Sequence, residues 1–178
     1  MTSDGEWVVY SSSNPDRPGI DRVRTDGTDD ELVVEGNWVQ PEVSPDGRFA
    51  LFVGSDNARL INVVHVVELA THEVTPFAVR IPFNLRSPNV TYGRGRWMPD
   101  GSAIVFVDID AEGRTGLSIQ DFDRERNLPD SRRAFVGFDG DIVFESFGIS
   151  PDGESVTFSA SEQTTAIPRV DGLPNLRE

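Results

Sequence analysis

Short runs of alternating apolar and polar residues, separated by tight-turn signals, recur along the whole chain. The tripeptide Pro-Asp-Gly occurs at residues 45–47, 99–101 and 151–153, and a further Asp-Gly occurs at residues 4–5. The glycines of successive turns are 42, 54 and 52 residues apart. A recurrence at this spacing indicates a repeat architecture in which every unit has the same local structure.

Two columns of apolar residues line up behind these turns. The third residue after each glycine is small or aliphatic, and the fifth is aromatic. Residues two apart lie on the same face of a strand, so each repeat directs both side chains toward a common core. Phe52, Phe106 and Phe158 are therefore expected to be buried between neighbouring sheets. The two columns are Val8, Ala50, Ile104 and Val156, and Tyr10, Phe52, Phe106 and Phe158.

Each repeat predicts four short antiparallel strands joined by tight connections. A strand that includes Val43, Trp97 or Ile149 leads into each Pro-Asp-Gly turn, where proline fixes φ and glycine accepts a positive φ. No segment longer than a turn has the helical period of 3.6 residues, so an all-β chain is expected. The β-rich runs after the aromatic column are residues 20–25, 61–69, 116–122 and 167–170, followed by shorter runs at 32–34, 74–77, 133–136 and Leu176.

Four-stranded units of this length match the blades of a β-propeller, in which small twisted sheets pack face to face around an axis. We expect one propeller domain over residues 1–178. A β-sandwich whose hairpins share a turn motif is the alternative, and the aligned columns argue against it. The expected blades are approximately residues 1–36, 37–87, 88–139 and 140–178.

The strand count predicts an incomplete, open propeller. Asp4-Gly5 corresponds to the turn after an inner strand, so the first blade lacks that strand, and residues 173–178 are short and contain a proline. An open array leaves strand edges and apolar faces uncovered. We expect an open arc of about four blades that associates through its end blades or depends on a further N-terminal part. A compact four-bladed ring, closed by pairing the last strand with the first blade, is the other possibility.

The segment at residues 43–52, Val-Ser-Pro-Asp-Gly-Arg-Phe-Ala-Leu-Phe, and its counterparts resemble the WD-repeat-like propeller family that includes TolB and the non-catalytic domains of some peptidases. Residues 21–28 resemble the third strand and turn of that family. Met98 stands where the family motif has serine, and insertions at residues 78–96 and 123–141 depart from the pattern. The resemblance implies a recognition or scaffolding module whose partner binds at one rim or over the channel mouth.

Composition and charge narrow the classes of partner. The 178 residues carry a formal net charge of −14, which disfavours binding to a nucleic-acid backbone. The lack of cysteine excludes disulfides and thiolate metal sites and leaves the compartment undecided. The chain as given has no secretory signal and no apolar stretch of about eighteen residues, so no membrane span is expected. A protein or peptide partner is expected.

Few residues carry candidate catalytic chemistry. His65 and His72 are the only histidines, and a strand residue followed by a turn residue is not the facing pair that a zinc site needs. Ser150 precedes a proline in a repeat turn, unlike the serine of a nucleophile elbow. Residues 93–96, Gly-Arg-Gly-Arg, lack the strand and helix of a phosphate-binding loop. We therefore expect no catalytic residue, metal or cofactor, and a chain that is not an enzyme.

One hairpin is a candidate calcium site. Asp108, Asp110 and Glu112 place three carboxylates at alternate positions before Gly113, like the start of a calcium-binding loop. The twelfth position holds Ile119 instead of a bidentate glutamate, and strands are expected on both sides. A solvated hairpin tip is favoured, while calcium binding stays open. The acidic run at residues 26–31 is likewise expected to be a solvated loop.

The insertion before the Asp100-Gly101 turn carries the candidate partner contacts. Loops on a rigid scaffold commonly carry function, and this polar segment combines exposed arginines with a tyrosine in an otherwise acidic chain. An ordinary variable loop is the alternative. The candidate contact residues are Asn84, Arg86, Tyr92, Arg94 and Arg96.

Two functions from different classes follow from these observations. The first is a non-catalytic β-propeller module for recognition or scaffolding of a protein partner or ligand. The alternative is the C-terminal part of the propeller domain of a larger enzyme, similar to prolyl-oligopeptidase-like hydrolases or propeller-bearing kinases, which gates or orients substrate. A carbohydrate-cleaving propeller is disfavoured, because two histidines do not supply the histidine-rich centre it would need.

Overall fold

The computed structural model describes residues 1–56, 58–82, 95–139 and 142–162. In these residues nearly all regular structure is β, and the strands form four antiparallel sheets. The all-β prediction is therefore confirmed. No helix in the described ranges is long and apolar enough to cross a membrane.

The four sheets follow one another along the chain, and neighbours in sequence are neighbours in each sheet. The first sheet contains β1 (Trp7–Ser12), β2 (Gly19–Arg24) and β3 (Glu31–Glu35). The second contains β4 (Val39–Val43), β5 (Phe49–Asp56), β6 (Ile61–Glu68) and β7 (Val74–Pro82). The third contains β8 (Gly95–Trp97), β9 (Ala103–Ile109), β10 (Thr115–Asp121) and β11 (Arg133–Asp139), with a 3₁₀ turn at Pro129–Ser131. The described part of the fourth contains β12 (Ile142–Ile149) and β13 (Val156–Glu162).

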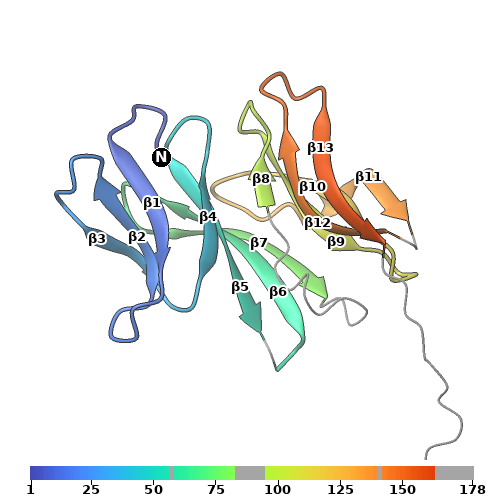
Figure 1. The fold of residues 1–178 in the computed structure, drawn as a ribbon, viewed down its shortest axis with the longest axis horizontal. Coiled ribbons are helices and arrows are strands. Elements are labelled where there is room, and N and C mark those ends of the chain that lie inside the picture. Colours follow the sequence, from blue (N-terminus) through green and yellow to red (C-terminus); the bar gives the residue numbers. More distant parts are fainter. Residues whose placement is uncertain (57, 83–94, 140–141, 163–178) are drawn as a thin grey trace, which may run out of the picture.

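Figure 1 shows these sheets side by side in an open array, with β1–β3 at one end and β12–β13 at the other. Within these described ranges no sheet closes on itself, and the architecture is that of a partial, open β-propeller. The runs predicted at residues 20–25, 61–69 and 116–122 are observed as β2, β6 and β10. The runs predicted at residues 167–170 and at Leu176 lie outside the described residues.

The repeated Asp-Gly turns share one backbone geometry. The Gly47 amide donates a 2.9 Å hydrogen bond to the Ser44 carbonyl oxygen, and Gly47 has a φ of 75°. The glycines at 101 and 153 have φ values of 73° and 75° and make the same bond. Gly5 repeats the pattern with the Thr2 carbonyl. The positive φ explains why each turn needs glycine at this position.

A hydrogen bond from a hydroxyl group to the turn aspartate stabilises three of the four turns. Ser44 Oγ donates to Asp46 Oδ1 at 2.6 Å and accepts a 2.9 Å hydrogen bond from the Phe49 amide. The same pair is formed by Thr2 with Asp4 and by Ser150 with Asp152. Ser150 is therefore a turn residue, as its sequence context predicted. In the turn that has Met98, the aspartate instead accepts from the hydroxyl of the following serine, Ser102.

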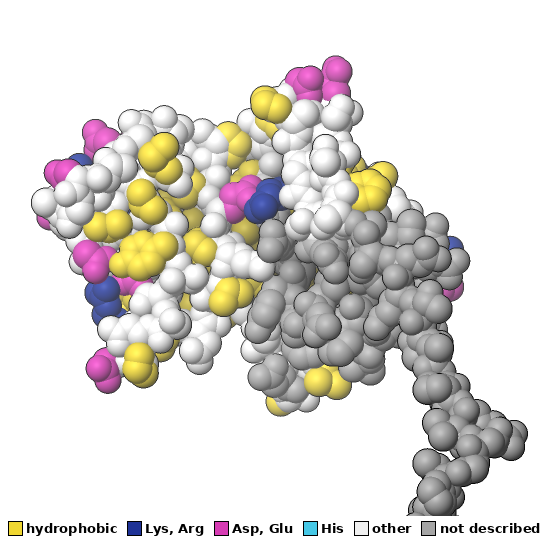
Figure 2. Space-filling view, viewed as in Figure 1, with side chains coloured by type: hydrophobic (Ala, Val, Ile, Leu, Met, Phe, Trp, Pro, Cys, Tyr) yellow, Lys and Arg dark blue, Asp and Glu magenta, His cyan; other side chains and the backbone are white. Residues whose placement is uncertain are grey.

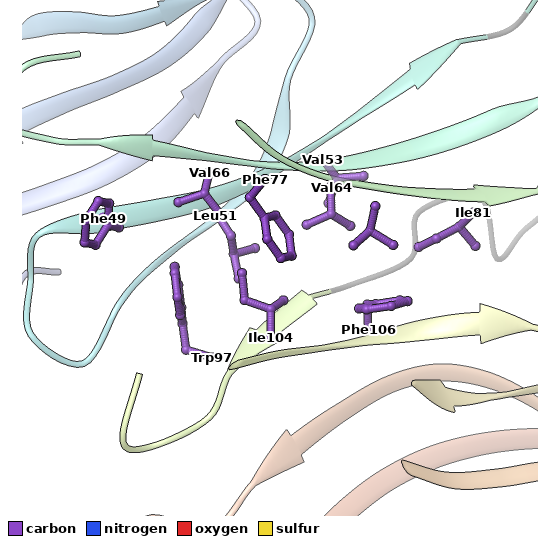
Figure 3. Packing of buried hydrophobic residues seen from close by; sticks show 11 residues of the cluster. Phe49, Leu51, Val53, Val64, Val66, Phe77, Ile81, Trp97, Ile104 and Phe106 are labelled. Carbon is purple, nitrogen blue, oxygen red and sulfur yellow. The ribbon is translucent and has the colours of Figure 1, made fainter. Parts of the chain in front are cut away.

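Three hydrophobic clusters lie between successive sheets. Figure 3 shows side chains of the second sheet pointing toward Trp97, Ile104 and Phe106 of the third. The second and third sheets therefore bury both faces. The cluster between the first two sheets includes Val9, Ile20, Val33, Ala50 and Phe52. The middle cluster includes Leu51, Val53, Val64, Val66, Phe77, Trp97, Ile104 and Phe106. The cluster between the third and fourth sheets includes Val105, Val107, Leu117, Ile119 and Phe147.

The aligned apolar columns are buried only where a neighbouring sheet covers them. Phe52 and Phe106 are almost completely buried, as predicted. The prediction for Phe158 is wrong, because its residue is 42% exposed. Phe158 lies on β13, which pairs with β12 in the described part of the chain, and its exposure shows that the third sheet covers it less completely than the neighbouring sheets cover Phe52 and Phe106. Val8 is 37% exposed, because it lies on the face of the first sheet that is turned away from the second.

Candidate functional site

The sequence predicted that Arg96 lies on an exposed loop. In the structure it lies on strand β8 and its side chain is half-buried. Its Nη1 donates a hydrogen bond to Glu42 Oε2, and its Nε donates a 3.3 Å hydrogen bond to the Phe147 carbonyl oxygen. Glu42 belongs to β4 and Phe147 to β12. The expected exposure was wrong because β8 begins at Gly95, inside the stretch assigned to the insertion. Arg96 thus joins three successive sheets.

Glu42 is the hub of these contacts. Its Oε1 accepts a 3.1 Å hydrogen bond from the Trp97 amide, and its carbonyl oxygen accepts another of 3.1 Å from Trp97 Nε1. Burial raises the pKa of Glu42, while the Arg96 charge and the Trp97 amide act in the opposite direction. The inner strands of the second and third sheets are therefore fastened by a charged pair that serves the fold.

The remaining predicted contact residues, Asn84, Arg86, Tyr92 and Arg94, lie outside the described residues. Their role in partner contacts stays a prediction. Because Arg96 holds Glu42 and the Phe147 carbonyl, reversing its charge would disturb the fold as well as any partner contact. Arg94 alone is the better position for testing this segment.

An open cavity of about 500 Å³ lies on the third sheet. Its walls are the β9–β10 hairpin and the beginning of β11, so residues 108–118 and residues 132–134 meet there. Among the residues that the structure describes, three carboxylates and three guanidinium groups line it, with one hydroxyl and one methyl group. The lining residues are Asp108, Asp110, Glu112, Arg114, Ser118, Arg132, Arg133 and Ala134.

A partly buried ion pair forms one wall of the cavity. Asp108 is almost fully buried, and its carboxylate accepts hydrogen bonds from Nε and Nη2 of Arg132, the former at 3.1 Å. Arg132 also donates from Nη1 to the Arg80 carbonyl oxygen at 3.2 Å, and its guanidinium lies over the Phe106 ring at 5.1 Å from the centroid. A bidentate pair with these further contacts holds the wall in a single geometry.

The candidate calcium hairpin is organised by arginine. Asp110 accepts hydrogen bonds from the Arg114 amide at 2.8 Å and from Arg114 Nε at 2.7 Å. Burial acts to raise the pKa of Asp110, but the hydrogen bonds and charge of Arg114 outweigh it and leave the pKa below its usual value. Glu112 contacts Arg114 Nη2 at 3.3 Å. In the described ranges no three acidic or histidine side chains gather closely enough to hold a metal ion.

The acidic run at residues 26–31 is exposed but also paired with arginine. Arg24 Nε donates to Asp29 at 2.8 Å, and Arg22 pairs with Glu31. Asp30 accepts a 2.7 Å hydrogen bond from the Tyr10 hydroxyl, which raises the pKa of Tyr10 to about 12. These carboxylates therefore fix the edge of the first sheet, in addition to being solvated as expected.

The two histidines lie at separate structural positions. His65 packs between the first two sheets, stacked on Phe52 with 5.6 Å between ring centroids and against the edge of Trp38. Burial lowers the pKa of His65, so the neutral form is favoured. His72 lies in the β6–β7 turn, where its amide donates to the Glu68 carbonyl oxygen.

Sequence reasoning missed five of the eight described residues that line the cavity, since it named only Asp108, Asp110 and Glu112. Ser118, Arg132, Arg133 and Ala134 belong to no motif, and the arginines follow a turn inside an insertion. A run of two arginines next to a β-rich segment was visible, but nothing local indicated that it would reach Asp108, 24 residues earlier in the chain.

Comparisons with known proteins identify the fold. No protein-family model and no curated protein sequence matches the chain. TolB from Acinetobacter baumannii is 22% identical, with a TM-score of 0.62 over 89% of this chain and 36% of its own. The β-propeller domain of the trilobed protease from Pyrococcus furiosus is 17% identical, with a TM-score of 0.52 over 79% and 42%. Prolyl oligopeptidase B from Galerina marginata is 13% identical, with a TM-score of 0.63 over 93% and 27%.

These structures are β-propeller proteins, and the chain spans less than half the length of each. At such low identities the likeness shows the fold alone. The resemblance to TolB-type propellers is thus confirmed for the fold. Membership of the WD-repeat-like family stays a prediction, because no family model matches.

Proposed function

We propose that this chain is a non-catalytic β-propeller module that recognises a protein or peptide partner. The observation that carries the proposal is the open, polar cavity on the third sheet, whose wall is a bidentate ion pair on a rigid scaffold. Fixed donors and acceptors around a cavity of this size suit selective binding. The likeness to TolB-type propellers supports a role of this kind by analogy.

The polar groups of the cavity favour binding over chemistry. A general base needs a side chain free to take a proton from a substrate. Asp108 is held by Arg132 and Asp110 by Arg114, and the pKa of Asp110 lies below its usual value, which is the opposite of what a base near neutral pH needs. Among the described lining residues, these carboxylates and their arginine partners are therefore charges in fixed positions, which a bound partner can contact.

A substrate panel tests the non-catalytic part of the proposal. Purified protein incubated with ester, peptide and phosphate substrates should give turnover no faster than buffer. Asp108→Asn serves as the matched variant, because it keeps the shape of the buried side chain and removes its charge. Reproducible turnover in the parent protein that is lost in Asp108→Asn would contradict the proposal.

The second candidate function is part of the propeller domain of a larger enzyme, where it gates or orients substrate. The likeness to prolyl oligopeptidase B from Galerina marginata and to a protease propeller domain favours it. The discriminating observation is the coding sequence next to this one. A reading frame that continues into a hydrolase or kinase domain would favour the second candidate, and a frame without one would favour the recognition module.

A further inference from the structure

The first sheet has a strand edge that is open within the described ranges. Its strand order is β1-β2-β3, so β1 pairs with β2 on one side and with no described strand on the other. β1 follows the Asp-Gly turn at residues 4–5. The strands after the other three such turns each pair with the strand that leads into the turn, as β5 does with β4, β9 with β8 and β13 with β12. β1 therefore differs from its three counterparts at this edge.

The hydrogen-bonding groups at the open edge follow from the contacts of Trp7. Its amide donates to Thr2 Oγ1 at 3.0 Å, and its carbonyl oxygen accepts from the Thr2 amide at 2.8 Å, so both groups face away from β2. Main-chain groups of alternate residues point to the same edge of a strand. The N–H and C=O groups of Val9 and Ser11 therefore also point away from β2, toward the open edge.

The other sheets show how a strand fits at this edge. The corresponding turn of the second sheet has the same amide-to-carbonyl bond, from Ser44 to Phe49, at 2.8 Å. Counted from this bond, the counterpart of Val9 is Leu51, which pairs with Glu42 of the antiparallel strand β4. The open edge of β1 thus has the geometry that accepts an antiparallel strand. The same position pairs Val105 with Arg96 in the third sheet and Thr157 with Gly148 in the fourth.

The side chain that an added strand places opposite Val9 would face the second sheet. Residues directly opposite one another in an antiparallel pair point to the same face. The Val9 side chain is buried in the cluster between the first two sheets, and Val43 of β4, which lies beside β1, packs against the same cluster (Figure 1). An apolar residue opposite Val9 therefore suits this position. The net charge of −14 favours a segment that carries no net negative charge.

We propose that the open edge of β1 binds an extended segment of a protein partner, which adds an antiparallel strand along the main chain of Val9 and Ser11. The inference rests on the proposed recognition function and names the form in which the partner is held. Unpaired N–H and C=O groups at a sheet edge are a template for another chain. Recognition by strand addition uses these groups for affinity and alternate side chains for specificity.

Titration of the 178-residue chain with the acetylated and amidated peptide Lys-Val-Thr-Val-Thr-Lys tests the proposal. This peptide alternates apolar and polar residues and carries positive charge. Calorimetry should give saturable binding. In hydrogen exchange measured by NMR, the amides of Val9 and Ser11 should gain protection. Those of Val8 and Tyr10 should change little, because they already face β2.

Two N-methylated peptides test the direction of the hydrogen bonds. In the pair that Val9 would form, the residue opposite shares its face and directs its own N–H group to β1. Methylation of both valine nitrogens should therefore weaken binding about tenfold or more, because it removes these donors and adds bulk at the edge. Methylation of both threonine nitrogens should leave binding within about twofold, since these groups point away from β1.

Two proline variants locate the edge. Ser11→Pro removes an N–H group at the open edge and should weaken peptide binding about tenfold. Proline is tolerated in an edge strand where its nitrogen faces away from the sheet. Glu35→Pro is the matched control, because Glu35 is exposed and ends β3, at the other edge of the same sheet. Near-ultraviolet circular dichroism should be unchanged in both variants, and the N-methylated peptides decide the question if Ser11→Pro alters the spectrum.

The outcomes separate this inference from the proposed function. Lack of saturable peptide binding, equal affinity for the two N-methylated peptides, or protection that develops on β3 in place of β1 would each overturn the strand-addition site. So would equal binding by the parent and a folded Ser11→Pro variant. All of these leave the non-catalytic module standing. Turnover in the substrate panel would contradict the non-catalytic proposal and leave the strand-addition site standing.

Discussion

Arginine side chains carry contacts between the sheets at each junction. Arg22, Arg96 and Arg132 each pair with a carboxylate and also donate to a backbone carbonyl of another sheet. The carbonyl partners are those of Leu69, Phe147 and Arg80. The planar guanidinium has five donors in a fixed fork, so one side chain can serve both partners. At the scale of the residue, these arginines act as connectors between repeats.

Arg96→Lys tests this connector role. Lysine keeps the charge but cannot reach Glu42 and the Phe147 carbonyl with the same fixed geometry. We expect the free energy of unfolding, measured by urea denaturation, to fall by about 1–3 kcal/mol. Arg59→Lys is the control, since Arg59 is highly exposed and should leave the midpoint unchanged. Equal midpoints for both variants would show that Arg96 is not a connector.

The turn hydroxyls give a prediction about acid stability. The hydrogen bond from Ser150 is the largest cause that lowers the pKa of Asp152 below 3.8. A lowered pKa stabilises the folded state above the unfolded pKa, and this stability is lost as the pH falls through the folded value. In Ser150→Ala we expect the Asp152 pKa, measured by NMR, to rise toward 3.8, with less loss of stability as the pH falls below 3.8. Thr157→Ala, on the same hairpin, is the control and should leave the Asp152 pKa unchanged.

At the scale of the element, sequence periodicity predicted what local patterns determine. Glycine at a positive φ and alternating apolar residues depend on neighbours in sequence, so the turn at Gly47 and strand β6 were found correctly. Arg96 was misplaced because its partners Glu42 and Phe147 are 54 and 51 residues away. Phe158 was misjudged because burial depends on what covers the sheet. The cavity was missed because its walls come from segments that are separate in the sequence.

Phe106→Ala and Phe158→Ala form a matched pair for testing this view of the sheets. Phe106 is fully buried between the second and third sheets, so its truncation should cost about 3–5 kcal/mol of unfolding free energy. Phe158 is partly exposed, so its truncation should cost clearly less. Denaturant midpoints measure both. A Phe106→Ala midpoint within error of the parent, or equal losses in the two variants, would contradict the packing described here.

At the scale of the whole molecule, the outer faces of the first and fourth sheets differ in polarity. The outer face of the first sheet carries Val8, opposite Val23 on β2, and Figure 2 shows hydrophobic side chains over β1–β3. In the described part of the fourth sheet, the face turned away from the core pairs Ser146 with Ser159 and Gly148 with Thr157. Association is therefore expected at the first sheet.

Solution X-ray scattering combined with light scattering tests most directly whether the chain forms an open arc. We expect the scattering profile of an open array of successive sheets. If light scattering gives a particle mass above that of one chain, this mass should be lower in Val8→Asp, because that variant places a charge on the exposed face of the first sheet. A compact, monodisperse particle of 19.6 kDa with the scattering profile of a closed ring would contradict the open propeller.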